Sequence, residues 1–127
     1  MDIMNIVLWV VQVLLGVAFL LTGVNHAFRY DQIQTQQGMS WVAAVPQPLV
    51  TFIGFCEIFG AIGLVLPAVT GVWTWLTPLA ALGLAIIMAL AIGFHTRRNE
   101  TSNIIGNAIL LILALFVVYG RWMIVPV

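Results

Sequence analysis

The sequence predicts an all-α fold: a four-helix transmembrane bundle with up-down-up-down, antiparallel topology. Hydrophobic residues make up 63% of the 127 residues, and charged residues make up only 6%. The mean hydropathy is +1.15. The apolar residues fall into four runs, and each run is close to the roughly 20 residues that a membrane-spanning helix needs. We therefore expect a single transmembrane domain, residues 1–127, in contact with membrane lipids.

Prolines and changes in polarity predict where the four helices begin and end. We expect helices at about residues 3–27, 49–66, 76–94 and 104–119. Pro46 and Pro48 precede the second helix, and Pro67 follows it. Pro78 lies in the first turn of the third helix, where its missing amide hydrogen is not needed. Residues 41–45 are apolar and predict a short interfacial helix or lid within the first loop.

Small residues recur along these runs and indicate close helix packing. In lipid, packing rather than the hydrophobic effect drives helix association, and small residues let the backbones approach. The glycines concerned are Gly16, Gly23, Gly54, Gly60, Gly63, Gly83 and Gly106.

The charge and cysteine content exclude several classes of function. Four arginines balance four acidic residues, and the chain has no lysine. This balance argues against nucleic acid as a partner, because nucleic acid requires a basic surface. The single cysteine, Cys56, excludes an intramolecular disulfide and a cysteine-rich metal site. The N-terminus lacks the basic region of a secretory signal peptide, so we expect the first apolar run to remain as a helix.

The arginines predict an orientation in the membrane. The loops 28–48 and 95–103 lie on one side and hold three of the four arginines. By the positive-inside rule these loops are cytoplasmic and both termini are outside, in a multi-pass protein of the plasma (inner) membrane. We expect Arg121, the fourth arginine, to reach the outer interface; the alternative is that it turns inward as a counter-ion.

Glu57 is the residue that most strongly indicates function. It lies near the middle of the apolar run 49–66. An ionised carboxylate at this depth costs several kcal/mol unless it is paired, hydrated or protonated, so such residues usually face a bundle interior and are functional. The alternative interpretation is an interhelical hydrogen bond that only fixes the packing.

Other polar residues end up at the same end of the predicted bundle. His26 closes the first helix on the cytoplasmic side, and His95 closes the third helix on that side. We expect a cavity that opens at this interface and ends at Glu57, where a carboxyl and an imidazole could move a proton or bind a polar headgroup. The catalytic candidates are Glu57, His95 and His26, and the ligand-binding candidates are Asn25, Asn107, Met88 and Arg29.

Each of these residues also has a structural interpretation. The histidines could be ordinary interfacial residues, and Asn107 could join two helices by a hydrogen bond. His26, His95 and Glu57 together form a known type of metal ligand set. The chain lacks a closely spaced metal-binding motif, so we predict no metal site.

Several segments resemble the DoxX-like family of small four-helix membrane proteins. They are Gly54 to Leu64, Met88 to His95 followed by Arg97 and Arg98, then Asn107, and finally Val118 to Arg121. Family members often close the first helix with Gly-x-x-Lys, whereas this chain has His26 in place of the lysine. The family includes subunits of a membrane quinol oxidase and of thiosulfate:quinone oxidoreductase, proteins of redox or detoxification complexes, and distant receptor-assembly chaperones. The resemblance implies fold more strongly than activity.

Three functions are compatible with the sequence. The first is a site around Glu57 for a lipophilic small molecule, quinone-like or similar, with acid/base or redox-associated chemistry. The second is a non-enzymatic subunit or assembly factor within a membrane complex, and the third is a proton-coupled small exporter acting as a homodimer. We favour the first, because four helices direct polar groups to one end. The sequence has no motif for metal, nucleotide or flavin and does not identify a cofactor. If the chemistry is redox, the electrons come from a bound quinone or from a partner.

Overall fold

The computed structural model describes residues 2–127 and contains four helices that are long and apolar enough to cross a membrane. These helices are α1 (Ile3–Phe28), α3 (Gln47–Thr70), α4 (Leu76–Arg97) and α5 (Thr101–Tyr119). The short elements are α2 (Tyr30–Ile33), the 3-10 helix η1 (Ser40–Ala44) and the π-helical turn η2 (Gly120–Ile124). Residues 2–127 include no strand. The predicted all-α fold class, with four helices suited to span a membrane, is confirmed.

The second long helix, α3, runs further than predicted. We expected it to end before Pro67, but Pro67 lies inside it and is buried. A proline removes one helical hydrogen bond, yet the Thr70 hydroxyl holds the next turn by donating to the Leu66 carbonyl at 2.9 Å. The helix ends at Thr70, and Gly71, with a left-handed φ of 73°, forms its C-cap. At the other end Pro48 falls in the first turn instead of preceding the helix.

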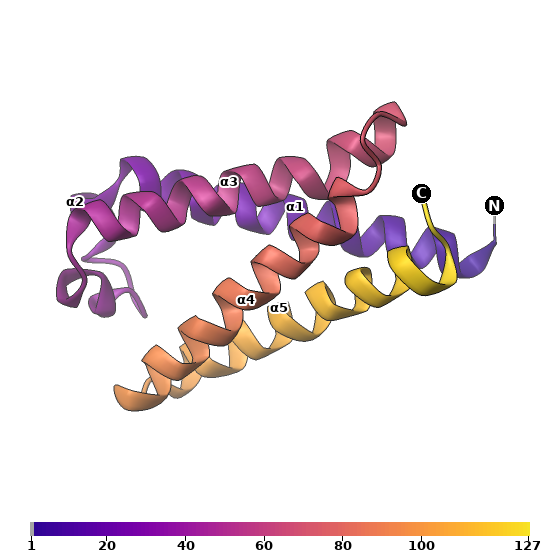
Figure 1. Ribbon diagram of the computed structural model, residues 1–127. Helices are drawn as coiled ribbons and strands as arrows, with labels where there is room; N and C mark the ends of the chain where they lie inside the picture. The colour runs from indigo at the N-terminus through magenta and orange to yellow at the C-terminus, as the bar shows by residue number, and fades with distance from the viewer. Residues whose placement is uncertain (1) are drawn as a thin grey trace.

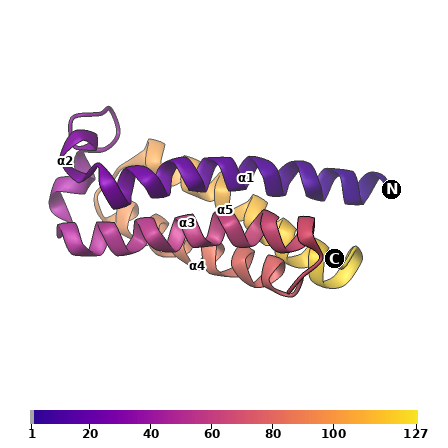
Figure 2. The same cartoon turned by 90° about the horizontal axis from the view of Figure 1, so that it is seen from above.

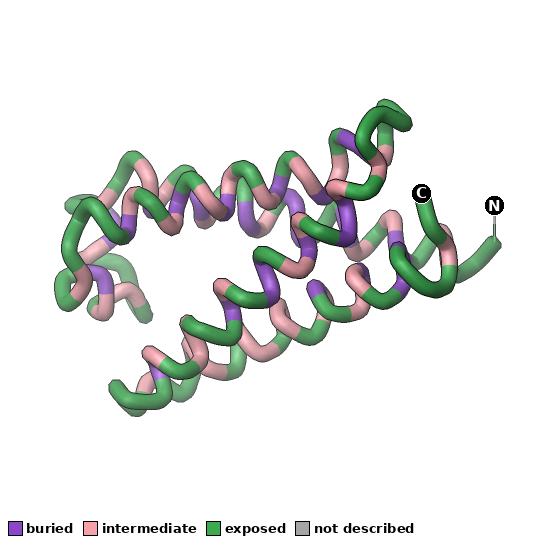
Figure 3. Tube along the Cα trace, in the orientation of Figure 1, coloured by how far each residue is buried: buried purple, intermediate pink, exposed green. Residues whose placement is uncertain are grey.

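The helices form two hairpins that share one core. In Figures 1 and 2, α1 runs along α3 and α4 runs along α5, and Figure 1 shows the two pairs diverging toward the end that carries α2. Buried residues lie on the faces that the helices turn toward one another, and the outer faces are exposed (Figure 3). The core draws on all four long helices: Leu15, Phe19, Ala61, Leu64, Ala81, Leu84, Ala85, Met88, Ala114 and Val117.

The outer faces are themselves apolar, as a lipid-facing surface requires. Phe59, Leu90 and Ile112 are each about two-thirds exposed or more, at 67%, 71% and 65%. A monomeric soluble protein rarely exposes so much contiguous apolar surface. The exposure pattern therefore agrees with four helices surrounded by lipid.

The contact between α1 and α3 depends on two glycines. A Cβ atom at Gly54 would lie 2.5 Å from the backbone nitrogen of Ala27 and 2.7 Å from the carbonyl oxygen of Gly23. A Cβ atom at Gly23 would lie 2.7 Å from the Gly54 carbonyl oxygen. These neighbours are backbone atoms, which cannot rotate away as a flexible side chain can. The two backbones therefore approach as closely as they do only because both residues lack a side chain.

We predict that Gly54→Ala pushes α1 and α3 apart and destabilises the protein. Overpacking a tight contact costs typically about 1–3 kcal/mol, so the midpoint of thermal unfolding in detergent should fall by several degrees. Gly106→Ala is the matched control, because a Cβ atom there meets nothing within 4 Å. Equal midpoints for the two variants would contradict the crossing described here.

Candidate functional site

The buried carboxylate Glu57 pairs with His26. The Nδ1 atom of His26 and the Oε1 atom of Glu57 are 2.6 Å apart, and both residues are buried, at 6% and 1% exposed. The glycine contacts place residues 23–27 of α1 against residues 54–58 of α3. His26 and Glu57 lie within these two facing segments. The glycine crossing thus brings the two side chains face to face.

The state of the other imidazole nitrogen follows from charge balance. A short imidazole–carboxyl bond in an apolar bundle is least costly when the pair carries no net charge. Both neutral arrangements, imidazolium with carboxylate and imidazole with carboxylic acid, keep a proton on Nε2 of His26. That atom is buried and has no hydrogen-bond partner within residues 2–127. The site therefore offers one N–H donor without an acceptor.

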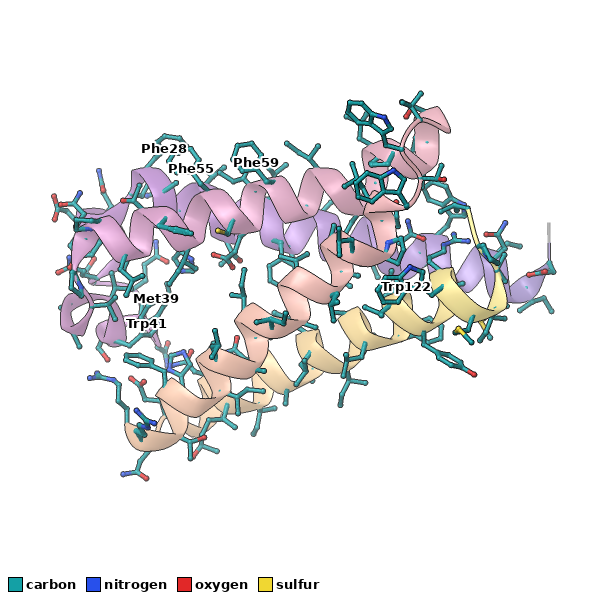
Figure 4. All side chains as sticks on the ribbon, viewed as in Figure 1. Phe28, Met39, Trp41, Phe55, Phe59 and Trp122 are labelled. Carbon is teal, nitrogen blue, oxygen red and sulfur yellow. The ribbon has the colours of Figure 1, made fainter. Side chains whose placement is uncertain are left out.

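Trp41 lies between the two predicted histidines. Its ring meets the rings of His26 and His95 edge to face, with centroids 5.4 Å and 5.5 Å apart. Trp41 belongs to η1, the short helix expected at about this position, and Figure 4 shows its side chain between α3 and the far end of α4. Two hydrogen bonds hold this loop: the Tyr30 hydroxyl donates to the Val45 carbonyl at 2.8 Å, and the Asn103 amide donates to the Gly38 carbonyl at 3.1 Å.

His95 does not reach Glu57; it forms a second pair with Glu100. Its Nδ1 atom is 2.8 Å from Oε1 of Glu100, and Nε of Arg98 donates to the same oxygen at 3.1 Å. Burial raises the pKa of Glu100, but the hydrogen bonds from His95 and Arg98 and their charges outweigh it. The pKa of Glu100 therefore lies below its usual value of 4.5. This pair closes the turn between α4 and α5.

The other predicted ligand-binding residues do not join the His26–Glu57 pair. The Arg29 guanidinium donates to the Asn25 side chain at 3.2 Å on the exposed side of α1. Met88 packs within the apolar core, and Asn107 is half-buried on α5. Within residues 2–127, no group of three or more His, Cys, Asp and Glu side chains could hold a metal ion.

An apolar groove lies away from the His26–Glu57 pair. It has a volume of about 930 Å³ between α3 and α4 and is lined by residues such as Phe59, Trp73 and Ile87. Cys56 lines this groove, whereas its neighbour Glu57 does not. The opening that we expected at Glu57 is closed in this structure, where His26 covers the carboxyl and Trp41 covers His26.

At the opposite end of the bundle, Arg121 is buried rather than extended to the outer interface as expected. It is 1% exposed. Its Nε donates to the Gln12 side-chain oxygen at 2.6 Å, and its Nη1 donates to the Asn5 side-chain oxygen at 2.7 Å. The outward prediction was wrong because the turn η2 directs this side chain back over α1. Gln12 was not among the predicted site residues, although a polar side chain within a long apolar run stands out in the same way as Glu57.

We predict that Glu100→Gln lowers the stability of the protein in a pH-dependent way. Because the pKa of Glu100 is lowered on folding, its contribution is complete above about pH 4.5 and is lost as the pH falls through the folded-state value. A partly exposed pair contributes up to about 1 kcal/mol, or about 4 °C in midpoint for a protein of this size. The midpoint difference from the original protein should shrink in acid. Asp31→Asn, at an exposed acid, is the control, and a difference independent of pH would contradict the assignment.

Comparison with known proteins now identifies the chain. Searches of curated proteins and of solved structures found no match. The family model described as the DoxX-like family matches residues 10–117, which include the core, the His26–Glu57 pair and Trp41. With four helices suited to span a membrane and most of its length matched, the chain is an integral, multi-pass membrane protein that belongs to the DoxX-like family.

Proposed function

We propose that the His26–Glu57 pair binds the polar head of a lipophilic small molecule, quinone-like in its chemistry. The observation that carries this proposal is the buried Nε2 of His26, which has no acceptor within residues 2–127. A buried donor without a partner costs about 1–3 kcal/mol. A ligand carbonyl oxygen supplies the missing acceptor.

The surroundings of this donor favour a flat and apolar molecule. Trp41 presents its ring next to His26, and Phe94 also packs against that ring, with the centroids of Trp41 and Phe94 6.1 Å apart. Ring systems prefer offset or edge-to-face contacts with such side chains. Small-molecule sites in proteins commonly combine an apolar lining with one or two placed polar groups. A ring that carries carbonyl or hydroxyl groups satisfies both requirements.

The pair also suits acid/base work on that ligand. The carboxyl of Glu57 keeps the imidazole charge-balanced, so His26 can hold a proton on both nitrogens without net charge in the bundle. A doubly protonated imidazole gives up the Nε2 proton to a ligand oxygen more readily than a neutral one does. This nitrogen is buried and Trp41 packs against its ring, so entry of the ligand requires that side chains around His26 move.

We expect Glu57→Gln to weaken binding of decylubiquinone, a soluble quinone. A neutral glutamine does not balance an imidazolium, so His26 carries one proton, and Nε2 loses its charge-assisted bond to the ligand oxygen whichever ring nitrogen keeps that proton. Loss of a hydrogen bond to a charged group costs about 1.5–3 kcal/mol, or about 10- to 100-fold in Kd. Quenching of tryptophan fluorescence in detergent measures the Kd, and Trp41→Phe identifies the signal from that ring.

The control for this experiment is Asp31→Asn, which removes an exposed carboxylate at the same end of the bundle. It should leave the Kd unchanged. His26→Gln, which leaves the carboxylate in place, tests the donor itself and should weaken binding equally. The proposal is wrong if folded Glu57→Gln binds the quinone as the original protein does, or if the original protein shows no Trp41-dependent quenching.

We further propose that this site opens to the cytoplasm from the plasma membrane. The arginine distribution supports that orientation, because the loops 28–48 and 95–103 hold three of the four arginines. A phosphatase fused to the C-terminus in a bacterial host should therefore be active, and a fluorescent protein fused there should be dark. The opposite pattern would place the site on the outer side.

A further inference from the structure

A second polar site lies at the other end of α1, centred on Arg121. The guanidinium group is held from three directions: by the side-chain oxygens of Gln12 and Asn5, and by the carbonyl of Val125, which accepts from Nη1 at 3.0 Å. The amide nitrogen of Gln12 donates in turn to the Leu64 carbonyl at 2.7 Å, so both ends of the Gln12 amide are used. This network fixes the guanidinium in place across three helices.

The network does not neutralise the charge. Every hydrogen-bond acceptor around Arg121 is a neutral amide oxygen, and within residues 2–127 no carboxylate lies within salt-bridge distance of it. Asp2 acts on Arg121 only by charge from beyond salt-bridge distance, and its side chain accepts from the Asn5 backbone at 2.7 Å and caps α1. A buried cation without a counter-ion costs several kcal/mol, and arginines inside membranes normally pair or face water.

One part of the guanidinium is unused. Its Nη2 atom is buried and has no hydrogen-bond partner within residues 2–127, while Nε and Nη1 are both engaged. The Trp9 ring lies 5.6 Å from the guanidinium carbon and makes the surroundings apolar. The residue sits on the π-helical turn η2, and π-helical turns are frequent at functional sites because they redirect a side chain.

We propose that Arg121 binds an oxyanion, the phosphate or carboxylate headgroup of a membrane amphiphile, through Nη2. A guanidinium presents N–H groups in a planar fork that matches the oxygens of these anions, and such charge-assisted bonds are the strong ones. The anion also supplies the counter-charge that the network lacks. This proposal does not depend on the function proposed for His26 and Glu57.

The position of Arg121 along the helices fits the headgroup of a lipid rather than a wholly buried ligand. Tyr119 and Trp122 flank Arg121 and are exposed, at 60% and 48%, as interfacial aromatics are. Figure 4 shows Trp122 near the C-terminal end of the bundle. Nη2 is buried, so an oxyanion reaches it only when neighbouring groups move aside.

The test uses the purified protein in dodecyl maltoside, which carries no oxyanion. We expect dioleoylphosphatidylglycerol to raise the midpoint of thermal unfolding and to remain bound in native mass spectrometry, and dioleoylglycerol, with the same chains but no phosphate, to do neither. Inorganic phosphate alone distinguishes the source of the anion: stabilisation as large as that by the lipid assigns the site to free phosphate. Oleate tests whether an amphiphile with a carboxylate headgroup also binds and stabilises the protein.

Variants of Arg121 test whether this residue is responsible for the lipid binding. Arg121→Gln should weaken lipid binding by about 10-fold or more, and Arg121→Lys, which keeps the charge but loses the fork, should have an intermediate effect. Arg97→Gln is the matched control, because Arg97 is an exposed arginine at the opposite end. The lysine variant keeps the test valid if the glutamine variant does not fold. Equal stabilisation by the two lipids, or loss of binding in the control as large as in the Arg121 variants, overturns the proposal.

Discussion

The contact between the backbones at Gly23 and Gly54 is the constraint on which the rest of the structure depends. It sets the distance between α1 and α3, because neither main chain carries a side chain at the point where the two meet. His26 lies on the stretch of α1 that meets α3 here, and Glu57 lies on the facing stretch of α3, so an imidazole faces a carboxyl. The polar pair is therefore a consequence of packing, and the packing is a consequence of two missing side chains.

Apolar length and local chemistry account for what could be predicted. The four long helices follow from runs of apolar residues, which any span must have, and Glu57 stood out because a carboxylate among such residues is costly. The end of α3 could not be read from Pro67, since a hydroxyl and a glycine one turn later decide where the helix stops. A proline alone does not carry that information.

The sequence could not show which acid each histidine pairs with, for a different reason. His26 and His95 look equivalent as histidines at helix ends on the same side, yet one binds an acid on another helix and the other binds an acid in the next turn. Which occurs depends on how the helices cross, and periodicity within one helix says nothing about its rotation against another. Arg121 was misplaced for the same reason, because its direction is set by the turn η2.

The separation in sequence between partners bears on how the protein is made. His26, Trp41 and Glu57 all belong to the first half of the chain, so the pair and its cover can form once α3 has entered the membrane, before α4 and α5 are synthesised. Arg121 instead joins residues more than a hundred positions earlier, Asn5 and Gln12. Its network can close only after α5 is in place, and it therefore forms later than the His26–Glu57 pair.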